Sequence, residues 1–366
     1  MVVCVGSGGV GKTTMTAAIA LDAAVRGRRV LCLTIDPAKR LANSLGLRAM
    51  TTEMQSIDPA LLASVGGDGR GSLAVMMLDT KRTFDDLVTK YASSPERRDR
   101  ILGNKLYQYI STSLAGTQEY MAMEKLYAVR DDERFDLVCL DTPPTSNALD
   151  FLHAPERLVG ALDSQAMRWF VQAWEGAGKF SFGLVGRGAA FVLKGLSKFT
   201  GAGFLEQVAH FVTDLNDLFG GFRERARRVY ESLRSRDVAF VIVTSPDPMA
   251  VTEALFFDEQ LSAAGMNRQA LVVNRVHGEL PMPEPSESRL REIVAGRTRD
   301  GVDAAALLGK MSRALDDFRT AAVQDAAQVE RLGGSIGGEV PLARVPAFQA
   351  DVHDLDALRR VATHLS

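Results

Sequence analysis

One short pattern near the beginning of the chain limits the folds open to it more than any other feature. The segment from Gly6 to Thr13 (GSGGVGKT) matches G-x-x-x-x-G-K-[ST], and it lies between the apolar run Val2 to Val5 and the alanine-rich run Thr14 to Arg26. Glycines in such a segment let successive backbone N–H groups curve around a phosphate, and the start of the following helix adds its positive dipole end. The pattern predicts a phosphate-binding loop between a buried strand and a helix.

The side chains of this loop predict a nucleotide site. Lys12 would reach the β and γ oxygens of a nucleotide, and the Thr13 hydroxyl would ligate Mg²⁺. A glycine-rich turn could match the pattern by chance, but the strand and helix on either side argue against that alternative. The residues expected to bind the phosphates are Gly8, Gly9, Val10, Gly11, Lys12, Thr13 and Thr14.

Short apolar segments recur along the chain with helical stretches between them. Runs of this length bounded by Gly, Asp or Pro are typical of strands buried on both faces. Their alternation with helices predicts an α/β fold, a doubly wound and mainly parallel sheet of the P-loop NTPase type. The six expected strands are Val2 to Val5, Val30 to Ile35, Leu73 to Leu78, Leu137 to Leu140, Ala239 to Thr244 and Leu271 to Val273.

A long stretch interrupts this alternation. Residues 149–237 are too many for one crossover helix, so we expect a core of residues 1–148 and 238–366 with a helical insertion at 149–237. Phe222 to Arg236 has the pattern of a basic amphipathic helix. The insertion could pack on the sheet or expose an apolar groove for a client or partner.

Further along the chain, the glycine-rich residues 333–338 are expected to form a loop.

Two aspartates follow predicted strands. Asp141 ends the apolar run 137–140, which is the Walker B arrangement, and we expect it to hold Mg²⁺ through a water ligand. Asp36 follows Ile35 and precedes Pro37, a position suited to orienting water in line with a γ-phosphate. Asp141 taken alone could instead cap a turn. Asp36 could be a plain cap before Pro37, and sequence spacing alone does not exclude that alternative.

Four segments together resemble the ArsA-type ATPase family. They are GSGGVGKTT at 6–14, TIDPA at 34–38, DTPPT at 141–145 and VNR at 273–275. That family includes the arsenical pump ATPase and the targeting factor for tail-anchored membrane proteins, within the larger group of dimeric ATPases that contains MinD and ParA. The resemblance covers residues 1 to about 150 and about 238 to 350, and it implies ATP and Mg²⁺ as cofactors.

The resemblance also implies residue roles. Asp36 would be the switch I residue that orients the attacking water, and residues 141–145 would form switch II. Asn274 is similar to the family residue that hydrogen-bonds adenine, although Val-Asn-Arg after a strand also occurs in ordinary turns. Pro341 and Leu342 would lie in the loop that covers the base. The catalytic residues are then Asp36 and Lys12, and the metal is held by Thr13 and Asp141.

The chain departs from the family pattern at the second loop residue. Members of this group have a signature Lys there that reaches the partner subunit's phosphates, whereas this chain has Ser7. A hydroxyl does not replace that cation. Hydrolysis could be slow, Lys39 or Arg40 could substitute, or a related Lys-bearing subunit could complete the site in a heterodimer.

Composition and the positions of the cysteines argue against several kinds of ligand and partner. Lys and Arg total 43 against 45 Asp and Glu, a net charge of −2, which gives no general basic field for nucleic acid. Cys4, Cys32 and Cys139 fall in expected core strands and form no CxxC pair, which argues against arsenite binding and a zinc-linked dimer. We expect no signal peptide, no membrane span and at most peripheral membrane contact, hence a cytoplasmic protein.

These observations predict a Mg²⁺-dependent ATP hydrolase that works as a dimeric nucleotide switch, as a homodimer or with a related ATPase. A hydrophobic client protein could bind the insertion. The alternative is a weakly catalytic or non-catalytic nucleotide-gated scaffold that works beside a Lys-bearing paralogue.

Overall fold

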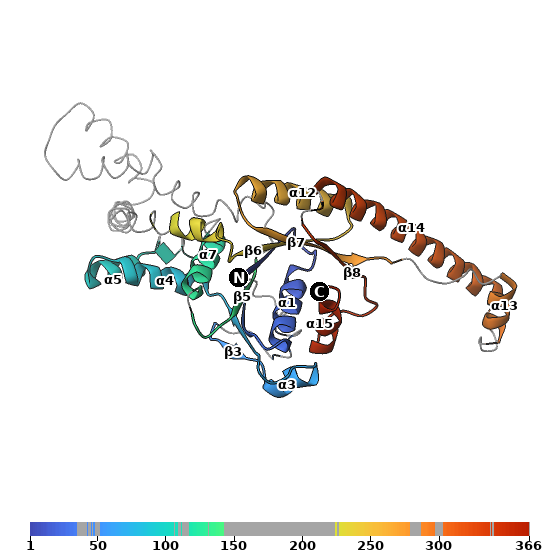
Figure 1. Cartoon of the computed structure of the whole chain (residues 1–366), viewed down its shortest axis with the longest axis horizontal. Helices are drawn as coiled ribbons and strands as arrows, with labels where there is room; N and C mark the ends of the chain where they lie inside the picture. Colours follow the sequence, from blue (N-terminus) through green and yellow to red (C-terminus); the bar gives the residue numbers. More distant parts are fainter. Residues whose placement is uncertain are drawn as a thin grey trace, which may run out of the picture.

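The sheet at the centre of the protein has the predicted doubly wound, mainly parallel form. The computed structural model describes residues 1–34, 42, 45, 47, 52–105, 107–108, 111, 117–130, 132–142, 224, 227–278, 287–296, 303–336, 338 and 340–365. Among these residues eight strands form one sheet in the order β3-β4-β2-β5-β1-β6-β7-β8 (Figure 1). The strands are β1 (Val2–Val5), β2 (Arg29–Thr34), β3 (Gln55–Ser56), β4 (Ser72–Met77), β5 (Leu137–Asp141), β6 (Ala239–Thr244), β7 (Arg268–Val276) and β8 (Leu342–Pro346).

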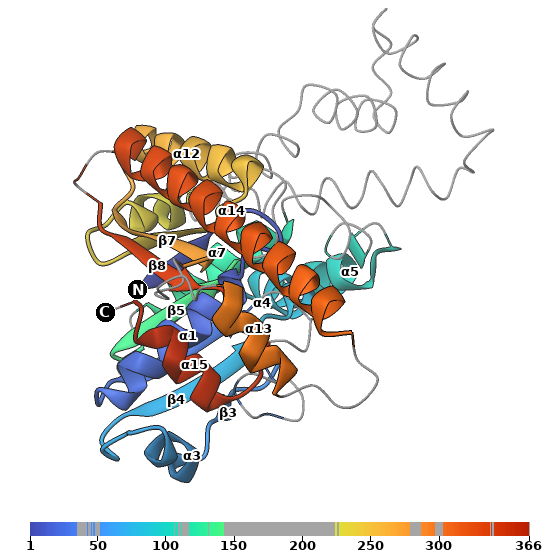
Figure 2. The ribbon, with the colours of Figure 1, turned by 90° about the vertical axis from the view of Figure 1, so that its right-hand side faces the viewer.

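The helices lie on both faces of this sheet, as Figures 1 and 2 show. In the described part of the chain they include α1 (Lys12–Val25), α3 (Pro59–Ser64), α4 (Thr80–Tyr91), α5 (Pro95–Gly103), α7 (Thr117–Val129), α12 (Pro248–Ala263), α13 (Glu287–Ala295), α14 (Ala304–Ile336) and α15 (Leu355–Ala362). No helix of this part is both long and apolar enough to cross a membrane.

All six predicted strands are present, and two further strands were not predicted. β3 has two residues and pairs antiparallel with β4, and so short a strand leaves no periodic signal in the sequence. β8 lies at the opposite edge of the sheet and pairs with β7. Its sequence, LARVP, includes an arginine and a proline, which edge strands tolerate and which do not give an apolar run.

Alternate strand residues supply two separate cores. Val3, Leu31 and Leu140 pack on the side that carries α4, α7, α12 and α14, whereas Cys4, Cys32 and Cys139 pack on the side that carries α1 and α15. This alternation follows from the two-residue period of a strand. It also fixes which strand-end side chains can meet the start of α1.

Helices in this chain often begin at an aspartate followed by proline. Asp58 caps α3 by accepting from the Ala60 N–H, and Asp247 caps α12 by accepting from the N–H groups of Met249 and Ala250. Proline follows both caps and occupies the first helical turn, where its missing N–H costs nothing. The Asp-Pro pair at 36–37 has the same pattern.

Helix α14 corrects one sequence prediction. Residues 333–338 were expected to form a loop, but the helix continues through Gly333 and Gly334 to Ile336. Leu332 is fully buried one residue earlier, and the Cβ position of Gly333 lies 3.9 Å from the Leu342 Cδ1 atom of β8. Packing against the sheet therefore outweighs the low helix propensity of glycine.

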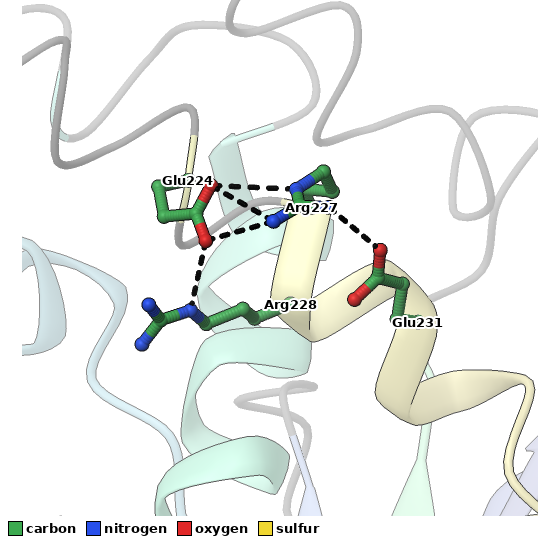
Figure 3. Close-up of polar contacts among 4 residues, drawn as sticks. All are labelled: Glu224, Arg227, Arg228 and Glu231. Atoms are coloured by element: carbon green, nitrogen blue, oxygen red, sulfur yellow. Dashed lines mark hydrogen bonds and ion pairs between the residues drawn. The ribbon is translucent and has the colours of Figure 1, made fainter.

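Most of the expected insertion, residues 149–223, lies outside the described residues. Its last part forms a helix at 227–233 whose Val229 and Leu233 are buried against the core. On the exposed side, Glu224 pairs with Arg227 and Arg228, and Arg227 also pairs with Glu231 (Figure 3). Exposed pairs of this kind add little stability, so apolar packing holds this helix. The domain boundaries stay a prediction.

The C-terminal helix should be essential to the stability of the fold. Leu358 of α15 is 0% exposed in the core beside α1, so we expect Leu358→Ala to lower the free energy of unfolding by about 2–5 kcal/mol. Urea denaturation followed by circular dichroism would measure the change. Leu61→Ala is the matched control because that side chain is 41% exposed. An equal effect of both substitutions would contradict the role assigned to α15.

Candidate functional site

The predicted phosphate loop lies at the carboxyl edge of the sheet. β1, which leads into the loop, pairs with β5 on one side and β6 on the other, both in parallel. The connection from β1 runs to β2 beyond β5, whereas β6 starts the other half of the sheet. Open α/β sheets bind ligands at such a point, outside the carboxyl ends of the strands.

Two loop glycines are required by backbone geometry and by space. Gly6 has φ +151°, and a Cβ there would lie 2.0 Å from the Val243 carbonyl oxygen of β6. Gly11, the residue before α1, has φ +100°, and its Cβ would lie 2.3 Å from the Asn274 amide nitrogen. A left-handed conformation disfavours any L side chain, so the loop and β7 approach each other through a position that only glycine fits.

Lys12 extends back along the loop. It is the first residue of α1, it is only 6% exposed, and its Nζ donates to the carbonyl oxygens of Gly6 at 2.9 Å and Ser7 at 2.8 Å. The first N–H groups of a helix have no acceptor within the helix and carry the positive end of its dipole. An ammonium group and a helix start at one loop form a site for an anion such as a phosphate.

Asp141 lies beside this loop, at the end of β5. Its Oδ2 accepts from the Thr13 hydroxyl at 2.8 Å and from the Thr34 hydroxyl at 3.0 Å. Asp141 is opposite Cys4 of β1 and Thr34 of β2 in the sheet register, so the three side chains share the face covered by α1. The next residue, Thr142, donates its hydroxyl to the Cys4 carbonyl at 2.7 Å.

The oxygen atoms of Thr13 and Asp141 suit a hard divalent cation. The Thr13 hydroxyl has one proton, and Asp141 accepts it, so the lone pairs of the hydroxyl are left for a metal. Mg²⁺ prefers oxygen ligands and binds proteins through one or two such groups together with phosphates and water. These residues therefore fit Mg²⁺, with Thr13 able to bind it directly and Asp141 through water.

Asn274 of β7 also contacts the phosphate loop. Its Nδ2 donates to the Val10 carbonyl at 2.9 Å, and its Oδ1 accepts from the N–H of Arg275, which has φ +62°. The amide keeps a second N–H and a second lone pair. Its predicted hydrogen bond to adenine is untested and stays a prediction, whereas its bond to the loop is a contact that the sequence did not suggest.

Pro341 and Leu342 do not lie where the predicted base-covering loop would be. Leu342 begins β8 and pairs with Leu271, and the Pro341 carbonyl accepts from the Leu271 N–H at 2.9 Å. Both therefore lie at the amino end of a parallel strand, whereas the phosphate loop lies at the carboxyl ends. The part of β8 that reaches the carboxyl edge is Pro346, whose neighbour Ala347 donates to the Val276 carbonyl.

Two polar contacts near the site were missed by sequence reasoning. Thr34 begins the TIDPA segment, which predicts no role for it, and its register opposite Asp141 is what brings its hydroxyl to that carboxylate. His277 binds Asp325 of α14 through both its backbone N–H and Nδ1, each at 2.8 Å. Its ring also meets Phe318 edge to face, with centroids 5.5 Å apart.

The three cysteines are buried as predicted. All lie in the core on the α1 side of the sheet, and none is exposed. Burial raises the pKa of Cys4 to about 12 and raises the pKa values of Cys32 and Cys139. Because the thiolate is the form that binds soft ligands, these thiols are poorly suited to arsenite. Within the described residues no group of three or more His, Cys, Asp or Glu side chains could hold a metal ion.

Asp36, with Lys39 and Arg40, lies outside the described residues, and so do residues 143–145 of the expected switch II. β2 ends at Thr34, so Asp36 follows the strand that borders the Walker B strand. Its proposed catalytic role and its alternative role as a helix cap both stay open.

The family model for anion-transporting ATPases matches residues 1–292, which include the phosphate loop, Asp141 and Asn274. The chain belongs to the anion-transporting ATPase family. The match confirms the resemblance seen in the four sequence segments. α14, β8 and α15 lie beyond the matched residues.

Individual relatives are distant. The ATPase get3 of Aspergillus terreus is 28% identical over 160 residues, 43% of this chain and 43% of its own length. The ATPase GET3 of Phaeosphaeria nodorum is 24% identical over 276 residues, 74% of each chain. An uncharacterized protein of Streptomyces coelicolor is 28% identical over 340 residues, 89% of this chain and 77% of its own. The first alignment thus spans less than half of that relative.

Gly11 offers a test of the loop geometry. We expect Gly11→Ala to lower the affinity for ADP by at least about tenfold, because left-handed strain and the collision with Asn274 together displace the loop. Isothermal titration calorimetry would measure the affinity. Gly66→Ala is the matched control, since Gly66 has φ +97° and open space around its Cβ position. Unchanged ADP affinity in Gly11→Ala would contradict the assignment.

Proposed function

We propose that the protein is a Mg²⁺-dependent ATP hydrolase that acts as a dimeric nucleotide switch. The observation that carries this proposal is the assembly of Lys12, Thr13 and Asp141 around one helix start at the carboxyl edge of the sheet. Membership of an ATPase family supports it. We further propose a cytoplasmic location and a hydrophobic client or partner protein bound through residues 149–237.

Each residue has a distinct part in the proposed reaction. The loop N–H groups and Lys12 bind the phosphates and stabilise the charge that develops on transfer. Thr13 and Asp141 would hold Mg²⁺, which neutralises charge on the β and γ oxygens when bound. Asp36 is proposed to orient the attacking water. Asn274 holds the loop through Val10, and we propose that its remaining amide groups read adenine.

A segment other than Pro341 and Leu342 lies at the edge of the sheet where a base would be covered. β8 ends at Pro346, on the carboxyl edge of the sheet. Pro346 pairs with Val276 of β7, which lies two residues after Asn274. We propose that Pro346 and the residues after it, rather than Pro341 and Leu342, lie over the base.

Asp36 can be tested separately as a water-orienting group and as a helix cap. Asparagine caps a helix as well as aspartate does, so Asp36→Asn keeps a capping role and removes the carboxylate. We expect it to retain ATP binding and to lower turnover by about 10²-fold or more. Phosphate release and nucleotide titration would measure the two quantities.

Lys12→Ala is the comparison for that experiment, because we expect it to lose turnover and to weaken nucleotide binding as well. Normal turnover in Asp36→Asn would remove Asp36 from the mechanism. Normal binding and turnover in Lys12→Ala would reject the nucleotide site itself.

The heterodimer alternative rests on Ser7, whose carbonyl accepts from Lys12 but whose side chain carries no cation. If a cross-dimer cation is the missing part, Ser7→Lys should raise the turnover of the isolated chain by about 10²–10³-fold, the size of effect that one preorganised donor has on turnover. Ser7→Gln, which has a long neutral side chain, is the matched control.

A Lys-bearing paralogue provides the complementary test. We expect its addition to the unaltered chain to give a mixed dimer in size-exclusion chromatography with light scattering and to raise ATP turnover. A paralogue that neither binds nor stimulates, together with equal turnover of Ser7→Lys and Ser7→Gln, would exclude the heterodimer and leave the slow-hydrolysis or scaffold alternatives.

A further inference from the structure

We propose that Thr34 is a positioning residue for the metal-linked carboxylate. The hydroxyl of Thr34 would hold Asp141 in the orientation that the Mg²⁺ shell requires, without touching nucleotide or metal itself. This inference rests on the proposed function and adds to it a role for Thr34, the first residue of the TIDPA segment, to which the resemblance assigns none.

The first support is geometric. Asp141 Oδ2 accepts from two hydroxyls that come from different segments, Thr13 at the start of α1 and Thr34 at the end of β2. Thr13 belongs to the phosphate loop, whereas Thr34 is fixed by the pairing of β2 with β5 directly opposite Asp141. One donor is therefore positioned by the start of α1 and the other by the sheet.

The second support is burial. Thr34 and Asp141 are both 0% exposed, so water does not compete for the bond between them. A hydrogen bond to a carboxylate is stronger in such surroundings, and losing a donor to a buried charged group is correspondingly costly. Branching at Cβ limits Thr34 to few rotamers, so the direction of its hydroxyl is set by the strand.

The third support is that the hydroxyls of Thr13 and Thr34 would have different roles. The lone pairs of Thr13 are the ones that fit the metal, so its hydroxyl would contact both Asp141 and Mg²⁺. Thr34 donates to the same Asp141 oxygen from the end of β2. It would align that carboxylate, as partners of metal ligands commonly do.

The test compares Mg²⁺-dependent and Mg²⁺-free nucleotide binding. In Thr34→Val the side chain keeps its shape and loses its donor. We expect the Mg²⁺ concentration for half-maximal enhancement of ADP binding, measured by calorimetry, to rise about 10–100-fold, while ADP affinity without Mg²⁺ stays as in the unaltered protein. Thr34→Ser restores the donor and should return the Mg²⁺ dependence toward the original value.

Thr244→Val is the matched control. Thr244 is also 0% exposed and ends another parallel strand of the sheet, β6, but its hydroxyl donates to the Ser245 carbonyl. It should lose stability without a change in Mg²⁺ dependence. If Thr34→Val does not fold, Thr34→Cys replaces it, since a thiol is a poor donor of similar size.

Unaltered Mg²⁺ dependence in Thr34→Val, or in Thr34→Cys where that variant replaces it, would overturn the inference and leave the proposed function standing. An equal shift in Thr244→Val would do the same. Failure of the unaltered protein to bind ADP with or without Mg²⁺ would instead reject the proposed function and this inference with it.

Discussion

The arrangement of the site depends on the position of one buried carboxylate. Asp141 ends the strand that lies between β1 and β2, and hydroxyls from α1 and β2 donate to the same oxygen of it. A charge in this position is stable only while those donors stay in place. Asp141 therefore links the start of α1 to the end of β2, and the phosphate loop that leads into α1 lies next to this link.

The parts of the fold that the sequence predicts are those where one local pattern decides the outcome. The apolar runs of β1, β2, β4, β5, β6 and β7 are buried on both faces, and this makes them recognisable. β3 and β8 are edge strands whose pairing is a tertiary event, so their residues give no comparable signal. The end of α14 likewise depends on packing against β8, which outweighs the glycines at 333 and 334.

The residues of the candidate site also fall into those that a local motif predicts and those that depend on tertiary contacts. Lys12, Thr13 and Asp141 belong to contiguous motifs, and the structure brings all three together. Thr34 and the loop contact of Asn274 depend on register between distant strands, which a single sequence does not show. Pro341 was assigned by likeness alone, and the direction of β8 places Pro346 at the relevant edge instead.

The end of β7 and the residue after it, His277, connect the phosphate loop to α14. Asn274 is bonded to the phosphate loop, and His277, three residues on, is bonded to Asp325 in the middle of the 33-residue helix α14. Three residues of extended chain span only about 10 Å, and Arg275 between them has a positive φ. Because Asn274 and His277 are both held by hydrogen bonds, the chain between them can change its length very little. A shift of the loop at Val10 must be absorbed by rotation at Arg275 or transmitted to α14 as a displacement of its buried face.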